Sequence, residues 1–366
     1  MVHTRRRLLI DLLAMTTSGI GPLLAQAAAQ ETPFAESGYL PESAAHRLTS
    51  EMAGKDGSYV MTLLRLPLPD MIPGIIEADL ASGEVWFVAG GGGFAGFTEA
   101  PLSWFGKCDA AGNCVLYRLQ TPRALPNGIS LSESSIAISQ YLANRIAVID
   151  RKTMQCRDYP VPTPDSRPTG IVIGADEIWF CENAGHKIGF LKGGQIREFA
   201  IPTGRARPTG IALHPGRKLV AFSEMYGNKI GLFSAETGFA EIPLLSENAR
   251  PTFLSFAGGD GNTVLVSERG ANRMALVDIA QKSVQEITLP PAESGPFGSR
   301  LARDGSIWVA LMNSNSVLNL APDGRIITKL TVPVRNAMPG GLCLDGAGNI
   351  WVTLHGANSL LKISII

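Results

Sequence analysis

Short apolar stretches alternate along the chain with turns rich in glycine, asparagine and proline, and this arrangement recurs seven times. Each copy opens at a proline; the seven are Pro73, Pro126, Pro168, Pro208, Pro251, Pro296 and Pro339, at intervals of 53, 42, 40, 43, 45 and 43 residues. In the third copy a second strand follows in Ile178-Trp-Phe-Cys-Glu-Asn, a third at 187–191 and a fourth at 196–202. Four short strands in each period of about 40–50 residues predict the blade of a β-propeller.

The length of the last copy predicts how the ring closes. From Pro73 to Ile366 there are 294 residues, or seven units of 42, but the seventh unit has only 28 and stops after its third strand. The segment Tyr59–Pro67 matches the fourth-strand pattern of the other copies. Pairing it with the C-terminal strand would remove the exposed sheet edges of an open ring. We therefore expect an all-β, seven-bladed propeller over residues 58–366, with an insertion in blade 1 at about 90–115.

Composition narrows the possible functions. The formal net charge is zero, whereas a nucleic-acid-binding protein needs a basic surface. No segment after residue 30 is apolar for the roughly 20 residues that cross a bilayer. We expect a monomer with a small-molecule ligand, no nucleic-acid partner and no membrane span in the mature chain.

The first 30 residues have the features of an export signal. Thr4-Arg5-Arg6-Arg7-Leu8-Leu9 is similar to a twin-arginine signal, and small residues that suit cleavage follow at 25–29. An ordinary secretory signal is the alternative. Both predict a periplasmic or secreted protein. Residues 31–57 read as a polar lead-in, with one short helix around Ala44–Met52.

An exported protein with five cysteines can form a disulfide. Cys108 and Cys114 bracket Asp-Ala-Ala-Gly-Asn, which is typical of a hairpin tip, and this spacing suits a local bridge. The alternative is a hairpin held by its turn alone. The other three cysteines lie in predicted strands and are expected to be small buried side chains.

The repeat itself resembles a known family. Arg-Pro-Thr-Gly-Ile, followed by Ile-Trp-Phe-x-Glu-Asn-x-x-x-Lys-Ile-Gly, is similar to the blade consensus of virginiamycin B lyases (streptogramin lyases), which are seven-bladed propellers. The similarity is clearest at 167–191 and 207–232. It implies an enzyme that opens the lactone ring of a streptogramin by elimination, with magnesium and histidines near the central channel.

The chain departs from the family at the positions that this activity would use. The resemblance implies a histidine after the blade-starting proline in the last two blades, where this chain has Phe297 and Gly340. It implies metal-binding glutamates at the positions of Met338 and, nearest to the second, His355. Phenylalanine is no base, and a thioether is a poor ligand for a hard cation. We therefore do not expect activity on streptogramins themselves.

Propeller geometry predicts which residues gather on one face. The loop into the first strand and the loop after the second strand open on the same side. That side should collect Arg167, Arg207 and Arg250 with Glu182, Glu224 and Glu268, and also Asn313 and His355. In one interpretation the arginines and Asn313 bind a substrate, while Glu224 and Glu268 hold a divalent ion, magnesium or calcium. In the other, each glutamate pairs with an arginine of a neighbouring blade and locks the blades together.

His355 is the one member of this set that breaks the repeat. The other blades have Tyr141, Asn183, Met225, Arg269 and Met312 at its position. Its imidazole is our candidate for a catalytic base, the alternative being a histidine that only fastens the loop. Three hypotheses remain: a lyase or hydrolase that opens a small cyclic ester, a non-catalytic propeller that binds a ligand or partner, and a metal-dependent lactonase similar to the gluconolactonases.

Overall fold

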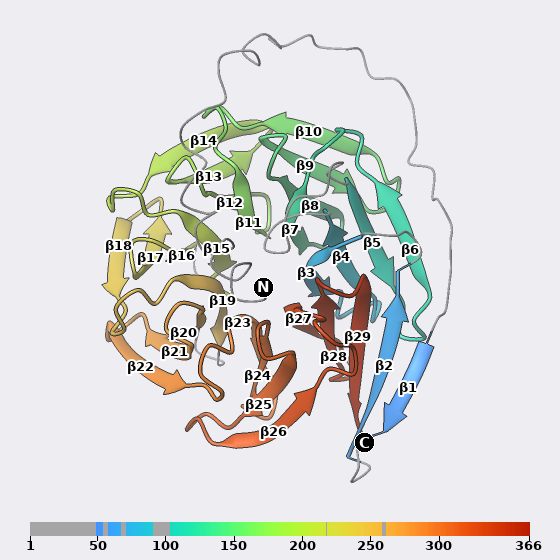
Figure 1. Ribbon diagram of the computed structural model, residues 1–366. Coiled ribbons are helices and arrows are strands. Elements are labelled where there is room, and N and C mark those ends of the chain that lie inside the picture. Colours follow the sequence, from blue (N-terminus) through green and yellow to red (C-terminus); the bar gives the residue numbers. More distant parts are fainter. Residues whose placement is uncertain (1–48, 54–57, 67–70, 91–102, 217, 258–260) are drawn as a thin grey trace, which may run out of the picture. The chain divides into compact units, whose positions relative to one another are not determined.

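Each repeat folds into one antiparallel sheet, and the seven sheets form a ring (Figure 1). The computed structural model describes residues 49–53, 58–66, 71–90, 103–216, 218–257 and 261–366. Within these ranges no residue is helical, and no helix could cross a membrane. The predicted seven-bladed propeller is confirmed. The expected export signal lies outside the described residues, as does the lead-in up to residue 48.

The strands of each blade follow one another outward from the ring axis. Blades 1 to 3 consist of β3 (Pro73–Ala78), β4 (Val85–Ala89), β5 (Trp104–Cys108) and β6 (Cys114–Arg118); β7 (Pro126–Leu131), β8 (Ser135–Gln140), β9 (Arg145–Asp150) and β10 (Cys156–Pro160); β11 (Pro168–Ile173), β12 (Ile178–Glu182), β13 (Lys187–Lys192) and β14 (Gln195–Ala200). Blades 4 and 5 consist of β15 (Pro208–Leu213), β16 (Val220–Glu224), β17 (Lys229–Ser234) and β18 (Gly238–Pro243); β19 (Pro251–Ala257), β20 (Thr263–Glu268), β21 (Arg273–Asp278) and β22 (Ser283–Thr288). Blade 6 consists of β23 (Pro296–Leu301), β24 (Ile307–Leu311), β25 (Ser316–Leu320) and β26 (Ile326–Thr331).

Blade 7 joins the two ends of the ring. Its strands are β27 (Pro339–Leu344), β28 (Ile350–Leu354) and β29 (Ser359–Ile365), completed by β2 (Tyr59–Arg65) and β1 (Thr49–Ala53). β2 pairs antiparallel with β29 from Tyr59↔Ile365 to Arg65↔Ser359, which confirms the predicted closure (Figure 1).

Two sequence-based boundaries differ from the structure. The helix expected around 44–52 is wrong at its C-terminal end, because residues 49–53 form the strand β1, whose backbone pairs with the outer edge of β2. The insertion expected at about 90–115 falls largely on residues 91–102, which are not described. From Trp104 onward the same range already contains β5 and the start of β6, which are regular strands of blade 1.

The hydrophobic core lies between neighbouring blades. The second strand of most blades is buried along its whole length, as in β12 and β16. Side chains on the two faces of such a strand therefore pack against different blades. One cluster, for example, joins Ile230 and Leu232 of blade 4 to Val264 and Val277 of blade 5. The free cysteines Cys156, Cys181 and Cys343 are buried in this interior.

A bulge at the start of every first strand shapes the inner ring. In all seven blades the pairing register shifts between the opening proline and the residue three positions later. In blades 2, 4 and 7 a hydroxyl from the second strand accepts the N–H that the bulge frees, as in Gly210 N–H to Ser223 Oγ at 2.9 Å. The Ser223 hydroxyl in turn donates to the Thr252 carbonyl of the next blade at 3.1 Å. In blades 2 and 4 the bulge is thereby fastened to the next blade.

Glycine allows the inner strands to approach one another. A Cβ on Gly128, Gly170, Gly210 or Gly298 would lie 2.5 Å from a carbonyl oxygen of the next blade. Real Cβ atoms do not come that close to backbone oxygens, so these junctions exclude a side chain.

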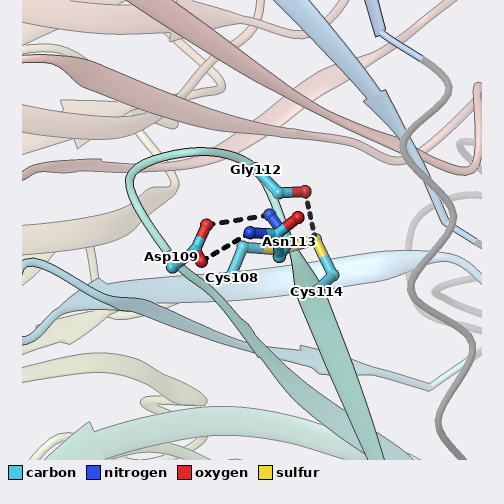
Figure 2. The surroundings of a disulfide bond; sticks show 5 residues. All are labelled: Cys108, Asp109, Gly112, Asn113 and Cys114. Carbon is cyan, nitrogen blue, oxygen red and sulfur yellow. Dashed lines mark hydrogen bonds between the residues drawn. A yellow bond between two sulfur atoms is a disulfide. The ribbon is translucent and has the colours of Figure 1, made fainter.

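Cys108 and Cys114 are joined by a disulfide across β5 and β6, where they face each other in register (Figure 2). The turn between them is held by Asp109, whose carboxylate accepts hydrogen bonds from the Asn113 backbone N–H and side-chain amide, each at 2.8 Å. The bridge therefore fixes the hairpin of blade 1 from its base.

Ring closure can be tested with two N-terminal truncations. A chain that begins at residue 66 lacks β2 and exposes the edge of β29, so we expect aggregation or a much lower melting temperature. A chain that begins at residue 58 lacks only β1 and should melt close to the full-length protein. Equal melting of the two chains in a thermal scan would contradict the closure described here.

The glycine junctions give a second test. Gly210→Ala should lower the free energy of unfolding by about 1–3 kcal/mol, because the new methyl group meets the Thr252 carbonyl. Gly204→Ala is the control, since no atom lies within 4 Å of a Cβ built there. Denaturant unfolding of both variants checks the difference.

Candidate functional site

The blade-starting prolines all lie on one side of the ring, which we call the proline face. Three equivalent positions of each blade meet there: the residue before the proline, the residue after it, and the residue after the second strand. In blades 2–7 the position before the proline has φ between 47° and 67°, with the residues Leu125, Arg167, Arg207, Arg250, Gly295 and Met338. Because this left-handed conformation is the same in each blade, it fixes the direction of the side chain.

The three predicted substrate-binding arginines occupy this position in blades 3, 4 and 5. The Arg167 guanidinium lies 5.5 Å from the ring centre of Tyr141, and that of Arg207 lies 5.6 Å from the ring centre of Tyr226. Arg207 is further held by its backbone N–H, which donates to His186 Nδ1 at 3.3 Å. Across the described residues none of the three forms an ion pair. Their charge is therefore not neutralised by a carboxylate in that part of the chain.

Arg269 adds a fourth cation to this side. It follows the second strand of blade 5 and donates to Met312 Sδ in blade 6 at 3.8 Å. Burial lowers the pKa of Arg269, and the positive charge of Arg250 lowers it further. Blades 3–5 thus present a cationic arc, made of Arg167, Arg207, Arg250 and Arg269.

His355 lies on the opposite arc of the proline face and is buried. Its backbone N–H donates to the Met338 carbonyl at 3.2 Å, and its ring meets Phe297 edge-on with 5.9 Å between centres. Nε2 has no hydrogen-bond partner among the described residues. Burial lowers the pKa of His355 to about 4, and the charge of Arg269 lowers it further, while a hydrogen bond to the Gly74 backbone opposes both. The imidazole is neutral near pH 7.

Gly340 makes room for this imidazole. A Cβ built on Gly340 would collide with His355 Nε2, so a side chain at position 340 and the imidazole exclude each other. Around His355 the same arc carries Phe297, Met312 and Met338. Blades 6 and 7 therefore carry an apolar arc with one neutral imidazole, next to the cationic arc of blades 3–5; Phe297, Met312 and His355 are buried and Met338 is half-buried.

Glu182, Glu224 and Glu268 do not pair with the arginines of the proline face. Their side chains are completely buried at the ends of β12, β16 and β20. In each of these blades an ion pair instead joins the start of the third strand to the fourth strand: Lys187–Glu198 at 2.9 Å, Lys229–Glu241 at 2.5 Å and Arg273–Glu286. The expected Glu–Arg lock between blades is therefore wrong, and the second glutamate of each blade takes the salt bridge.

In blades 3–5 the pKa of the inner glutamate is raised and the pKa of the neighbouring glutamate is lowered. Burial raises the pKa of Glu182 to about 8, and the nearby Glu198 carboxylate raises it further. Burial alone would raise the pKa of Glu198, but hydrogen bonds from Lys187 and Thr163 lower it overall. Burial, and then Glu241 or Glu286, likewise raises the pKa of Glu224 and Glu268 to about 7. In blade 2 the buried position holds Gln140, whose amide donates to Asp158.

The residues do not fit the expected metal site. Glu224 lies in blade 4, near Glu241 and Lys229. Glu268 lies in blade 5, near Glu286 and Arg273. The described part of the chain contains no group of three or more His, Cys, Asp or Glu side chains that could hold a metal ion. Asn313 has a partner within the protein, since its amide donates to the Glu293 carbonyl at 3.0 Å.

Sequence reasoning missed the second glutamate of each blade. Glu198, Glu241 and Glu286 recur in the fourth strands at intervals of 43 and 45 residues, each after a Lys or Arg that opens the third strand. That repeated pairing was the available signal. Which side chains these glutamates contact depends on their cross-strand neighbours, and the structure shows those.

The family model of the virginiamycin B lyase family matches residues 77–315. That range is well over half of the chain. The chain belongs to the virginiamycin B lyase family. No curated protein matches the chain.

Solved structures agree with the family on the fold. Virginiamycin B lyase from Staphylococcus aureus is 23% identical, with a TM-score of 0.75, and the match covers 84% of this chain and 100% of that one. A streptogramin B lyase is 25% identical, at the same TM-score, over 84% of this chain and 98% of the other. A catalytically inactive variant of the Staphylococcus aureus enzyme, with quinupristin, is 22% identical at a TM-score of 0.75, over 84% and 100%.

The buried glutamates of this family member predict a pH dependence. Because the pKa of Glu182 is higher in the folded than in the unfolded chain, its contribution to stability is complete below about pH 4.5 and is lost as the pH rises to about 8. A tenfold difference between the folded and unfolded acid constants corresponds to about 1.4 kcal/mol. Glu182→Gln, which copies Gln140, should therefore remove part of this loss and melt higher than the parent at pH 8. The exposed Glu236→Gln should leave the profile unchanged in thermal scans from pH 5 to 8.

Proposed function

We propose that the protein binds a small amphipathic molecule on the proline face, with an acidic or carbonyl group on the cationic arc and an apolar body on the apolar arc. The observation that carries this proposal is the division of equivalent positions into these two arcs. Three arginines without an ion-pair partner in the described chain favour an anionic or strongly polarised oxygen. Phe297 and Met338 favour an apolar partner opposite them.

The stacked arginines are suited to such a ligand. A guanidinium that rests on a tyrosine ring keeps its charge and its planar set of N–H donors, and it loses little conformational freedom when it binds. Arg167 on Tyr141 and Arg207 on Tyr226 both have this arrangement. A carboxylate or a lactone carbonyl has acceptor oxygens that match these donors.

Ring opening of a small cyclic ester, by elimination or hydrolysis, is the second candidate. It is favoured by membership of the virginiamycin B lyase family and by the neutral imidazole of His355, which can accept a proton. Arg250 or Arg207 would hold the ester carbonyl. The residues at 297, 338 and 340 make streptogramins themselves poor substrates in this proposal. A gluconolactonase-like mechanism has less support, since it needs several oxygen ligands around a metal.

We propose that the protein acts outside the cytoplasm, because residues 1–30 contain a segment similar to a twin-arginine export signal. The ligand would then come from the periplasm or the medium.

The two candidates are separated by binding and turnover of a matched pair of compounds. The first is 5-phenyl-δ-valerolactone and the second is its ring-opened hydroxy acid. We expect the hydroxy acid to bind in calorimetry and Arg207→Ala to weaken it about tenfold, whereas Arg197→Ala, which alters an exposed arginine of β14, should not.

Chromatography of the lactone incubated with the protein then tests catalysis. If His355 is the base, His355→Ala should abolish ring opening while the hydroxy acid still binds. Binding without turnover over a broad set of cyclic esters, with no stoichiometric divalent ion in the mature protein, leaves the non-catalytic binder. Absence of binding by both compounds and by related acids would refute the proposal.

A further inference from the structure

A cavity of about 660 Å³ lies on the side of the ring opposite the proline face. It is bounded by the far ends of the first strands of blades 1, 6 and 7, at Ala78, Leu301 and Leu344. Its volume is within the range of about 300–1,000 Å³ that is typical of small-molecule sites. None of the residues assigned to the proline face contributes to it.

One wall of this cavity carries a polar atom without a partner. Asn319, in β25, lines the cavity and is only 8% exposed. Its Oδ1 is shielded from solvent and accepts no hydrogen bond from any described residue. A buried acceptor that lacks a donor costs free energy. Trp308 and Thr328 flank Asn319 in register on the neighbouring strands, so the wall is otherwise a packed sheet surface.

The rim is apolar. Leu80, Ile327 and Ile365 all line the cavity and are 64%, 47% and 56% exposed. They belong to three different blades, yet they lie around the same opening. Large apolar side chains that remain exposed around a concave surface mark a binding site more often than isolated ones do.

Five charged residues line the cavity: Arg303 is exposed, and the other four are engaged within the protein. Arg300 binds Glu77 across blade 7 at 2.8 Å, and its guanidinium lies 4.6 Å from the ring centre of Phe253. Asp345 accepts hydrogen bonds from its own turn and from Trp351 Nε1 at 2.9 Å. Asp304 accepts from Ser306 at 2.7 Å. These groups do not select a charged ligand.

We propose that this cavity binds a neutral, mostly apolar small molecule that carries an N–H or O–H donor for Asn319 Oδ1. The apolar part of the ligand covers Leu80, Ile327 and Ile365, and the donor satisfies the amide oxygen once the Asn319 side chain turns Oδ1 toward the cavity. This site is independent of the proline face.

N-phenyl-1-naphthylamine is a suitable probe, because it is neutral, apolar and fluorescent in apolar sites, and it has a single N–H. We expect one saturable site per chain. 1-Benzylnaphthalene, in which CH₂ replaces the N–H, should displace the probe with lower affinity. Asn319→Leu should weaken the amine about five- to tenfold and leave the affinity of 1-benzylnaphthalene nearly unchanged.

A second variant keeps the test independent of folding at Asn319. Ile327→Asp alters an exposed rim residue and should weaken both compounds about tenfold, whereas Leu245→Asp, at a residue 66% exposed and outside the cavity, should weaken neither. Arg207→Ala should bind the probe like the parent, which separates this site from the proposed function. Failure of the probe to bind, or equal binding by the parent and Ile327→Asp, would overturn the proposal, as would equal losses for both compounds in Asn319→Leu.

Discussion

The contact between neighbouring inner strands is the constraint on which the rest of the ring depends. At Gly128, Gly170, Gly210 and Gly298 the next blade's carbonyl oxygen lies where a side chain would begin. In blades 2 and 4 the N–H that the bulge frees donates to a second-strand hydroxyl, Ser139 or Ser223, which ties the bulge to the adjacent blade. This close, polar packing sets the angle between blades, and the apolar cores between the outer strands follow from it.

The same bulge prepares the proline face for function. In blades 2–7 the residue before the proline is held in a left-handed conformation, whichever side chain it carries. The same backbone conformation therefore carries an arginine in blades 3–5 and a methionine in blade 7. In the proposed binding site, substitution at three positions per blade would change the side chains of the proline face without any change in the backbone. In this family member the result is a cationic arc next to an apolar one, with His355 in the space that Gly340 leaves open.

Buried glutamates show how the repeat tolerates acidic groups in its interior. In blades 3–5 the inner carboxyl has a raised pKa, while the outer one is ionised and bound to a lysine or arginine. A single charge per pair avoids two like charges in a dry site. Blade 2 reaches a similar arrangement with Gln140 and Asp158, whereas blades 1, 6 and 7 have Ala89, Leu311 and Leu354 at the inner position.

The sequence by itself determined the number of blades, their strands and the closure of the ring, because period and strand pattern are local properties repeated seven times. It also placed the three arginines and His355 on one face, since equivalent positions of a repeat point the same way. Only the tertiary structure decided the partners. It showed that Glu182 lies beside Glu198 and not Arg167, and that residues 49–53 form a strand. Such contacts join segments that are distant in sequence, and spacing within one repeat cannot specify them.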